Sequence, residues 1–479
     1  MQFEPVIGLE VHCQLATNSK LFCGCATTFG ADANHQVCEV CLGMPGTLPV
    51  LNKAAVDFAI KLALAVGGKV SEYSVFARKQ YFYPDLPKGY QITQFDQPYC
   101  EGGTVQVDQE TKVELIRIHI EEDAGKNIHA REASHIDYNR AGMPLAEIVS
   151  KPVIRSAAEA AAYLRSLRSL VRHIGISDGN LEEGSFRCDA NVSIKPLGSP
   201  VLGTRCEIKN LNSFRNVERA INFEIERQRD LITNGSKVVQ QTLLFDADSG
   251  RTAPMRSKEE SHDYRYFPEP DLPLLHITQA RIDRIKAELP ELPLAMATRF
   301  AAQYGLPEQD AQLLTQDKDV AAYFERSVLA CGGSVASKIV ANWVIGEVVP
   351  AAGQNNWDMR QPVIDHSSLA DLLKLLGVGT ISSKIAKSVF EEMIKTGDKP
   401  EHIVNRLGLV QVSDESAIAE IVEQVINGNP DQVAQYLAGK DKVLGFFVGQ
   451  IMRVSKGKMN PGLVNSILIK KLDERRDGK

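Results

Sequence analysis

The sequence has no long hydrophobic segment: nothing in its 479 residues approaches the ~18 uninterrupted apolar residues that a membrane-spanning helix needs. The stretch MQFEPVIGLEVHCQL also lacks the basic region and the apolar run of a secretory signal peptide. We therefore expect a cytoplasmic protein without a membrane partner.

Two common nucleotide-binding motifs are missing as well. The P-loop pattern G-x-x-x-x-G-K-[ST] does not occur, and no G-x-G-x-x-G follows a predicted strand. His129 and His135 do not have the i, i+4 spacing of a zinc peptidase helix. If the chain binds a nucleotide, it uses another kind of site.

The composition is that of a soluble globular protein, with 44% hydrophobic and 24% charged residues. The length exceeds that of one hydrophobic core and predicts two or three domains. The net charge of −6 argues against indiscriminate nucleic-acid binding. From Lys440 onward, however, ten Lys and Arg face four Asp and Glu, so the acidic chain has a basic C-terminal part.

Hydrophobic periodicity divides the chain into three parts and predicts an α+β fold. Residues 1–291 are rich in strand and turn signals and are expected to form a large, mainly antiparallel sheet domain. Residues 292–406 have the pattern of successive amphipathic helices, and residues 407–479 that of a small helical tail domain.

Two helices are expected inside the sheet domain. The first begins after Ser156 as its N-cap, has Glu159 at the capping-box position, and runs to His173. The second runs from Asn216 toward Gly235, which lies beyond its end.

Four of the nine cysteines are closely spaced. CGCATTFGADANHQVCEVC holds a C-x-C and, after twelve residues, a C-x-x-C: Cys23, Cys25, Cys38 and Cys41. Two such pairs can supply four tetrahedral thiolates to a structural zinc ion with no open position; unligated core cysteines are the alternative.

Four predicted strands combine an apolar face with a polar one. EEGSFRCDANVSIKP alternates strictly from Arg187 onward, as a strand with one face in the core does. The polar positions of the four strands and their ends include Glu10 and His12; Arg117, His119, Glu121, Glu122 and Asp123; Arg187, Asp189 and Asn191; and Glu207, Lys209, Asn210 and Ser213. A sheet face wetted by solvent is one explanation. Carboxylates and imidazole that hold Mg²⁺, with Lys and Arg for phosphate oxygens, are the other, and that combination suits phosphoryl transfer.

Basic and aromatic residues alternate in RKQYFYPDLPKGYQITQ. Lys79, Tyr81 and Tyr83 belong to this loop, which has the residues to receive a single-stranded RNA end; a rigid loop whose rings pack on the sheet is the alternative. Near the C-terminus, Arg453, Lys456 and Lys458 follow an apolar helix and are candidates for a phosphate backbone, or else form a solvated basic face.

The chain closely resembles the B subunits of the tRNA-dependent amidotransferases (GatB type) in the motifs VIGLEVH, RKQYFYPDLPKGYQI, HIEEDAGK, DYNRAGMPLAEIVS, EEGSFRCDANVSI, CEIKNLNSF, DYRYFPEPDLP and GFFVGQIMRVSKGKMNP. The resemblance covers nearly the whole chain in order. It implies a cradle-shaped catalytic domain, a helical domain and a helical tail that binds tRNA.

The resemblance implies a ligase that converts Glu-tRNA(Gln) to Gln-tRNA(Gln), or Asp-tRNA(Asn) to Asn-tRNA(Asn). The γ-phosphoryl group of Mg·ATP would pass to the side-chain carboxylate, and ammonia would then displace phosphate. The amidase, or A, subunit makes the ammonia from glutamine, and the small C subunit completes a heterotrimer. The Gly- and Ser-rich amidase signature is absent from this chain, which agrees with a separate glutaminase.

The resemblance also implies roles for individual residues. The Mg²⁺ ligands would be Glu10, His12 and Glu122, although strict strand alternation selects Glu121 in place of Glu122. Glu183, Asp189 and Glu207 match further acidic positions for metal and ammonia passage. Contacts to nucleotide phosphates or to the acceptor end are expected from Lys79, Lys209, Asn210, Ser213 and Arg215.

Two features of the residues and two other hypotheses accompany this resemblance. The four zinc-type cysteines occur in only part of the family, and Arg453 stands where Lys is usual. A tRNA-binding scaffold without chemistry of its own is a second hypothesis. A free-standing ammonia ligase for a small acid is a third, and the basic tail argues against it.

Overall fold

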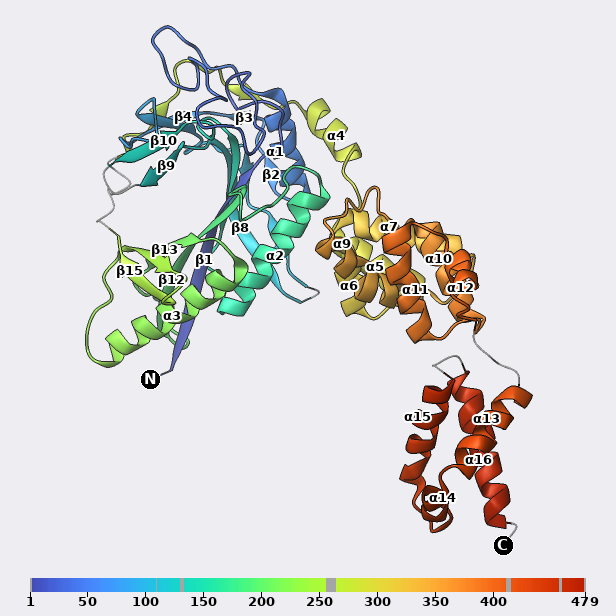
Figure 1. Cartoon of the computed structure of the whole chain (residues 1–479). Coiled ribbons are helices and arrows are strands. Elements are labelled where there is room, and N and C mark those ends of the chain that lie inside the picture. Colours follow the sequence, from blue (N-terminus) through green and yellow to red (C-terminus); the bar gives the residue numbers. More distant parts are fainter. Residues whose placement is uncertain are drawn as a thin grey trace. The chain divides into compact units, whose positions relative to one another are not determined.

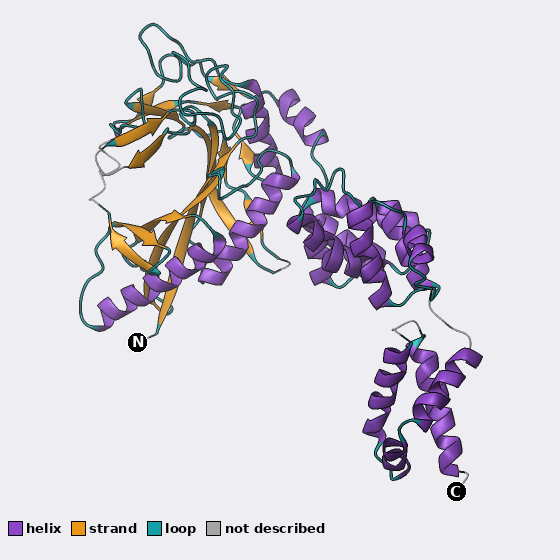
Figure 2. Ribbon diagram, viewed as in Figure 1, coloured by secondary structure: helices purple, strands orange, loops and turns teal. Residues whose placement is uncertain are grey.

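The computed structural model describes residues 2–108, 110–129, 133–255, 264–410, 415–455 and 459–477 (Figure 1). The chain forms two compact units, Met1–Met296 with Gln316–Lys318, and Ala297–Thr315 with Asp319–Lys479. The first holds the β-sheets and the second is helical, so the predicted α+β class is confirmed (Figure 2). The predicted boundaries at 291 and 406 stay a prediction.

The first unit is built on one large sheet. Its strand order is β15-β14-β13-β12-β1-β11-β8-β6-β2, with β7 beside β8. Within this sheet β13 and β14 run parallel, and the other described pairs are antiparallel. The strands are β1 (Phe3–Gln14), β2 (Lys69–Val70), β6 (Cys100–Glu101), β7 (Thr104–Gln106), β8 (Lys112–Glu122), β11 (Pro144–Ser150), β12 (Phe186–Pro196), β13 (Cys206–Leu211), β14 (Thr242–Asp246) and β15 (Arg251–Pro254).

Three small sheets complete the β structure of this unit. They are formed by β3 (Tyr73–Ser74) with β17 (Leu275–His276); by β4 (Ala77–Gln80) between β5 (Tyr90–Thr93) and β16 (Phe267–Pro268); and by β9 (Lys126–His129) with β10 (Ser134–Asp137). The β4 sheet is fixed by Arg78, whose guanidinium forms two hydrogen bonds with the buried Glu269 carboxylate.

The alternation of β1 separates a buried face from a polar one. Ile7, Leu9, Val11 and Cys13 are almost fully buried and belong to one hydrophobic core, while Glu10 lies between them on the other face. The same core contains residues of the helices α1 (Lys53–Ala65), α2 (Ala157–His173), α3 (Phe214–Thr233) and α4 (Gln279–Ala287). The helices therefore cover the apolar side of the sheet and leave its polar side to the site described below (Figure 2).

Both helices predicted in this unit are present. Ser156 caps α2 by accepting a hydrogen bond from the backbone N–H of Glu159, as predicted. The second helix, α3, begins at Phe214 and thus before the predicted Asn216, because the hydroxyl of Ser213 accepts from the Asn216 N–H and acts as the N-cap.

The second unit consists of helices. They are α5 (Pro293–Tyr304), which begins in the first unit, α6 (Glu308–Thr315), α7 (Lys318–Cys331), α8 (Ser337–Trp343), the π-helix η2 (Val344–Val348), α9 (Val349–Gln354), α10 (His366–Gly377), α11 (Ser383–Thr396), α12 (Pro400–Arg406), α13 (Glu415–Asn427), α14 (Pro430–Leu437), the 3₁₀ helix η3 (Asp441–Val443), α15 (Leu444–Val454) and α16 (Pro461–Asp477). Helices α13 to α16 enclose a hydrophobic core of their own, from Ile418 to Leu472. Within the described ranges, every helix is too short or too polar to cross a membrane.

Candidate active site

Strand register brings four polar residues into one row across the sheet. Arg187 of β12 is the direct partner of His12 on β1, and His12 is in turn the partner of Glu147 on β11. Glu147 is also the partner of His119 on β8. Directly opposed residues point to the same face of an antiparallel sheet, so all four side chains share the polar side.

The side chains in this row contact one another closely. The Nε2 atom of His12 lies 3.4 Å from Oε2 of Glu147, 3.5 Å from Oε1 of Glu121 and 3.7 Å from Oε1 of Glu10. The Nε2 atom of His119 lies 3.3 Å from the same Glu147 oxygen, and its Nδ1 accepts a hydrogen bond from Arg117. The His12 imidazole therefore lies among three carboxylates, and the His119 imidazole contacts one of them, that of Glu147.

Two groups in this cluster have the arrangement of a metal site. The ligand atoms of Glu10, His12 and Asp189 lie within 4.8 Å of one another, and so do those of His12, Glu121 and Glu147. His12 is shared by both groups. Carboxylate oxygens with one imidazole suit a hard divalent cation such as Mg²⁺.

The acidic surroundings alter the proton affinity of the cluster. Burial alone lowers the pKa of His12, but its contacts with Glu147 and Glu121 raise that pKa to about 9. Burial and the charge of Glu147 raise the pKa of Glu10. Burial also acts against ionisation of Glu147, yet His119 and His12 hold its pKa well below the usual range. A cation is thus favoured among these groups.

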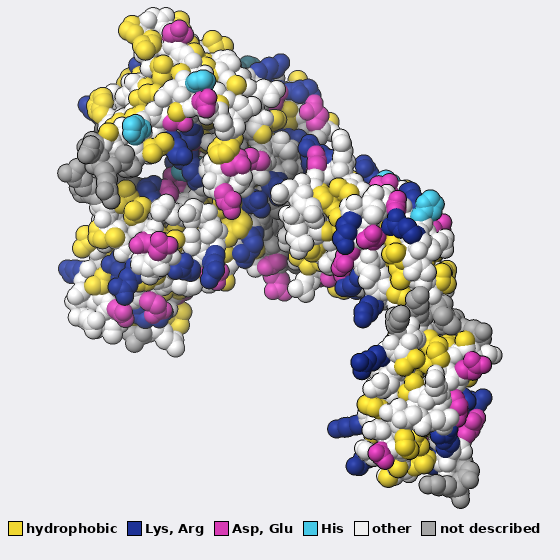
Figure 3. All heavy atoms as spheres, in the orientation of Figure 1, with side chains coloured by type: hydrophobic (Ala, Val, Ile, Leu, Met, Phe, Trp, Pro, Cys, Tyr) yellow, Lys and Arg dark blue, Asp and Glu magenta, His cyan; other side chains and the backbone are white. Residues whose placement is uncertain are grey.

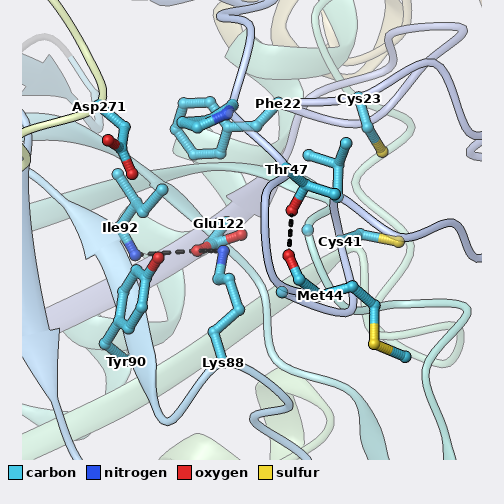
Figure 4. A pocket seen from close by; sticks show the side chains of 14 residues that line it. Phe22, Cys23, Cys41, Met44, Thr47, Lys88, Tyr90, Ile92, Glu122 and Asp271 are labelled. Atoms are coloured by element: carbon cyan, nitrogen blue, oxygen red, sulfur yellow. Dashed lines mark hydrogen bonds and ion pairs between the residues drawn. The ribbon is translucent and has the colours of Figure 1, made fainter.

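Glu122, which was expected to complete the set with Glu10 and His12, lies elsewhere. Its carboxylate accepts hydrogen bonds from Lys88 Nζ and from the backbone N–H of Ile92, in a pocket of about 200 Å³ (Figure 4). Adjacent residues of a strand point to opposite faces, and β8 continues without a bulge at this point. The structure therefore brings Glu121 rather than Glu122 to His12, and the choice of metal ligand between the two stays a prediction.

Other predicted residues lie along β12 and β13. The Nζ of Lys209 contacts Asp189 and lies 3.2 Å from Oε1 of Glu207, so this ammonium is held between two carboxylates. Glu207 also accepts a hydrogen bond from Thr242. Asn210 has a φ of 66° next to the register shift between β12 and β13, a left-handed conformation that Asn tolerates better than most residues.

A cavity of about 1090 Å³ opens in front of these strands. His12, Arg187, Asp189, Lys209 and Asn210 line it, and the exposed Glu183 lies on its wall without joining either metal-type group. The face drawn in Figure 3 shows the first unit hollowed, with Lys and Arg at the rim. The volume is slightly above the range of small-molecule and cofactor sites.

The aromatic loop contributes one cation near the cluster. Burial by itself lowers the pKa of Lys79, but the phenol of Tyr266 and the carboxylates of Glu121 and Glu147 raise it. The Lys79 ammonium lies 5.8 Å from the ring centre of Tyr81 and 4.9 Å from that of Tyr264.

The two ring-bearing residues predicted in this loop have different surroundings. The ring of Tyr81 lies against those of Tyr83 and Tyr264. Tyr83 is 60% exposed and Phe82 is 78% exposed, and their ring faces are open to a ligand.

The remaining predicted contacts lie outside the cluster. Ser213 is engaged as the N-cap of α3, and Arg215 is exposed in the first turn of that helix. Arg453 is exposed in the last turn of α15. Lys456 and Lys458 lie outside the described residues.

The four closely spaced cysteines come together. Each of Cys23, Cys25, Cys38 and Cys41 offers a sulfur within 4.8 Å of the other three, and all nine cysteines of the chain are free of disulfides. Tetrahedral thiolates on one zinc ion are about 3.8 Å apart, so small adjustments would suffice to bind it. The cluster can hold a metal ion.

A buried lysine lies beside this cluster. Lys20 is fully buried, with Nζ 3.7 Å from Sγ of Cys41 and 3.3 Å from the carbonyl oxygen of Tyr138. A hydrogen bond from Cys23 lowers the pKa of Cys41 to about 5, and the Lys20 ammonium acts in the same direction. The Lys20 ammonium therefore favours the thiolate form of Cys41.

Sequence reasoning missed two members of the site. Glu147 lies in PLAEIVS, an otherwise apolar strand, and a single buried carboxylate in such a run is itself a signal because it needs a partner. Arg187 was seen on the polar face but was given no role. The buried carboxylate of Asp123, at the end of β8, binds it at 2.7 Å.

Comparison with protein-family models shows the class of protein to which the chain belongs. The family model described as "GatB/GatE catalytic domain" matches residues 5–283, and the "GatB domain" model matches residues 322–472. The first covers more than half of the chain and spans the sheet, the cavity and both candidate metal sites.

The relatives make the assignment more specific. Proteins named as the B subunit of aspartyl/glutamyl-tRNA(Asn/Gln) amidotransferase are 53% identical in Pelodictyon phaeoclathratiforme and 52% identical in Thermodesulfovibrio yellowstonii, in each case over 99% of this chain and 100% of the relative. The protein of that name from a Geobacter species is 54% identical over 98% of this chain and 100% of its own length. The chain belongs to the family of the B subunits of tRNA-dependent amidotransferases.

Proposed function

We propose that this chain phosphorylates the side-chain carboxylate of Glu-tRNA(Gln), of Asp-tRNA(Asn) or of both, and amidates it with ammonia from a glutaminase subunit. The observation that carries the proposal is the His12 cluster, in which two groups of metal-type ligands share one imidazole at the wall of a large cavity. The names of the relatives supply the two tRNA substrates.

The reaction needs both steps because a carboxylate does not exchange oxygen for nitrogen at neutral pH. A carboxylate oxygen attacks the γ-phosphorus of ATP, the bond to ADP breaks, and an acyl phosphate forms. The ammonia nitrogen then attacks the acyl carbon, the C–O bond to phosphate breaks, and nitrogen loses a proton to give the carboxamide. Positioning and charge neutralisation are the main contributions of a protein to such a transfer.

The cluster supplies ligands of the type that Mg²⁺ prefers. We assign Glu10, His12 and Asp189 to one cation; His12 with Glu121 and Glu147 forms an alternative position for it, because the single lone pair of His12 Nε2 binds one cation at a time. Mg²⁺, when bound, neutralises the phosphate charge that develops during transfer. His119 contacts Glu147, and Arg117 in turn donates a hydrogen bond to His119.

Cations beside the cluster suit the remaining groups of the substrates. We assign Lys79 and Lys209 to nucleotide phosphates, since both ammonium groups lie next to the acidic residues that would hold the cation. Asn210 and Arg215, with the exposed ring of Tyr83, are assigned to the acceptor end of the tRNA. The basic residues around Arg453 are assigned to the tRNA backbone.

The cysteine cluster is assigned to a structural zinc ion. Four sulfur ligands leave no position for a substrate, so zinc would order the loops that carry them. The relatives are named as B subunits, which supports the presence of partner subunits. We assign the ammonia to the amidase (glutaminase) partner, the A subunit, with the small C subunit completing the heterotrimer, because the chain lacks an amidase signature.

The test uses the complex reconstituted with its glutaminase and small subunits, supplied directly with ammonium. Glu10→Gln is expected to abolish both amidation of charged tRNA and tRNA-dependent ATP hydrolysis. Glu226→Gln, an exposed carboxylate paired with Arg229 on α3, is the matched control and is expected to behave like the unaltered chain.

The same experiment separates an enzyme from a scaffold. If the sheet only positions tRNA for chemistry elsewhere, Glu10→Gln leaves ATP hydrolysis intact and charged tRNA still binds. Retained hydrolysis in that variant, with the control unchanged, would remove the proposed role of the cluster.

A further inference from the structure

Arg187 occupies the end of the polar row beside the cluster. It is the register partner of His12 on the neighbouring strand, and its side chain is 36% exposed at the wall of the large cavity. The two strands are antiparallel neighbours, so the guanidinium and the His12 imidazole lie side by side on one face. A ligand held by one of them is within reach of a ligand held by the other.

A buried carboxylate fixes this guanidinium from behind. Oδ2 of Asp123 accepts a hydrogen bond from Nη2 of Arg187 at 2.7 Å and one from Nε2 of Gln14 at 3.1 Å. Arg140 contacts the same oxygen at 3.5 Å and also donates to the carbonyl oxygens of Ala124 and Gly125. Such support limits the side-chain motion that binding would otherwise have to stop.

The charges of this group do not cancel. Arg187 and Arg140 are two cations on the single carboxylate of Asp123, and both line the cavity. These three groups together carry one net positive charge, and the carboxylates of Glu121 and Asp189 also act on Arg187 without forming an ion pair with it. Lys209, another cation on this wall, differs because its ammonium already contacts Asp189 and Glu207.

The guanidinium also has unused donors. Among the described residues, Asp123 is the hydrogen-bond partner found for Arg187, and it engages Nη2 alone. The Nε–H of Arg187 is buried and has no partner among those residues. A guanidinium carries five N–H groups, and a buried donor without a partner costs free energy until a ligand accepts from it.

We propose that Arg187 binds the side-chain carboxylate of the aminoacyl group on the charged tRNA and is a specificity-determining residue. This inference rests on the proposed function. The planar fork of a guanidinium matches a carboxylate in two parallel hydrogen bonds. The cation sites around His12 would hold the phosphates, so a carboxylate on Arg187 would lie beside the phosphoryl group that it attacks.

The same arrangement distinguishes substrate from product. Amidation replaces a carboxylate by a neutral carboxamide and thereby removes the charge that Arg187 attracts. Because hydrogen bonds between charged groups are stronger than those of neutral amides, the product is held less tightly. Uncharged tRNA, which has no carboxylate on its 3′ end, also lacks this contact.

The test compares Arg187→Gln and Arg187→Lys with the unaltered chain in the reconstituted complex supplied with ammonium. For Arg187→Gln, we expect the KM for Glu-tRNA to rise by about tenfold to a hundredfold while the KM for ATP stays unchanged. Arg187→Lys keeps the positive charge without the planar guanidinium. Its KM for Glu-tRNA is expected to lie between those of Arg187→Gln and the unaltered chain. The Kd of uncharged tRNA is expected to stay the same in all three.

Three results would overturn the inference. A parallel rise in the KM for ATP would assign Arg187 to a phosphate. Equal weakening of charged and uncharged tRNA would assign it to the tRNA backbone or to the fold. An unchanged KM for Glu-tRNA in an active Arg187→Gln complex would remove the contact itself, whereas an inactive unaltered complex would instead contradict the proposed function.

Discussion

Oε2 of Glu147 lies 3.4 Å from Nε2 of His12 and is fixed there by register, since the two residues are direct partners in adjacent strands. This contact was not predicted. It connects His12, which both candidate metal groups share, with His119, which contacts the same Glu147 oxygen. The first prediction concerns this carboxylate.

Glu147→Gln should weaken the binding of Mg²⁺ by about tenfold to a hundredfold, because it removes one charged ligand and leaves the others in place. Titration of the complex with Mg²⁺, followed by ATP hydrolysis, measures the effect. Glu226→Gln on the exposed side of α3 is the control. Unchanged Mg²⁺ dependence of Glu147→Gln would exclude this residue as a ligand.

The affinity for Mg²⁺ should increase with pH up to about 9. The pKa of His12 is raised to about 9, so this imidazole is protonated at neutral pH in the absence of metal and must lose its proton to become a ligand. Each pH unit below that pKa should weaken binding by about tenfold. Calorimetry at several pH values checks both the trend and the released proton.

A companion variant tests the cause of that pH dependence. Glu147 is the first of the groups that raise the pKa of His12, so Glu147→Gln should move the midpoint of the affinity curve to lower pH. A midpoint that stays at the same pH would show that another group controls the titration.

Glu122→Gln should destabilise the first unit without changing its Mg²⁺ affinity. The carboxylate is almost fully buried with Lys88, and the variant leaves that ammonium without its charged partner, which costs roughly 3 kcal/mol. Chemical denaturation measures the loss. The double variant Glu122→Gln with Lys88→Met should recover part of it, and a loss of Mg²⁺ affinity in Glu122→Gln would restore Glu122 as a ligand.

Purified without chelator, the protein should contain about one equivalent of zinc. Lys20→Met should lower the zinc affinity by about tenfold to a hundredfold, because the Lys20 ammonium lies 3.7 Å from Sγ of Cys41 and offsets the thiolate charge. Metal analysis after competition with a chelator is the measurement. Cys331→Ser, a buried cysteine of α7 outside the cluster, should keep its zinc, and metal-free unaltered protein would contradict the assignment.

Ser213→Ala should lower the free energy of unfolding by about 1 kcal/mol, because it removes the N-cap of α3. Ser213→Asp keeps a capping oxygen and should retain most of the stability. If Ser213 also contacts the acceptor end, the KM for charged tRNA will be higher for Ser213→Ala than for Ser213→Asp. Equal KM values would leave the residue with its structural role alone.

Local sequence patterns predicted the features that depend on neighbouring residues, such as the faces of a strand and the start of a helix. The period of two in the first strand identified Glu10 and His12 on one face, and the capping spacing identified the start of α2 at Ser156. Alternation also favoured Glu121, which the structure brings to His12. The family resemblance favoured its neighbour Glu122, whose carboxylate contacts Lys88 in this structure.

The row across the sheet could not be predicted in this way. His12 precedes the other three members by more than a hundred residues, and register between distant strands depends on the whole core rather than on any local signal. Arg187 could be assigned to a face but not to a partner. Asp123 shows the same limit, because its importance lies in three side chains that converge on one oxygen.

The central position of β1 in the sheet has a consequence for biosynthesis. Its neighbour β11 is complete only once residue 150 has been made, and its neighbour β12 only once residue 196 has, so the first strand of the nascent chain has no partner in this sheet before β11 is made. Its apolar residues stay available to chaperones over that interval. The group of His12, Glu121 and Glu147 can therefore assemble only after translation has passed β11, and the group of Glu10, His12 and Asp189 only after it has passed β12.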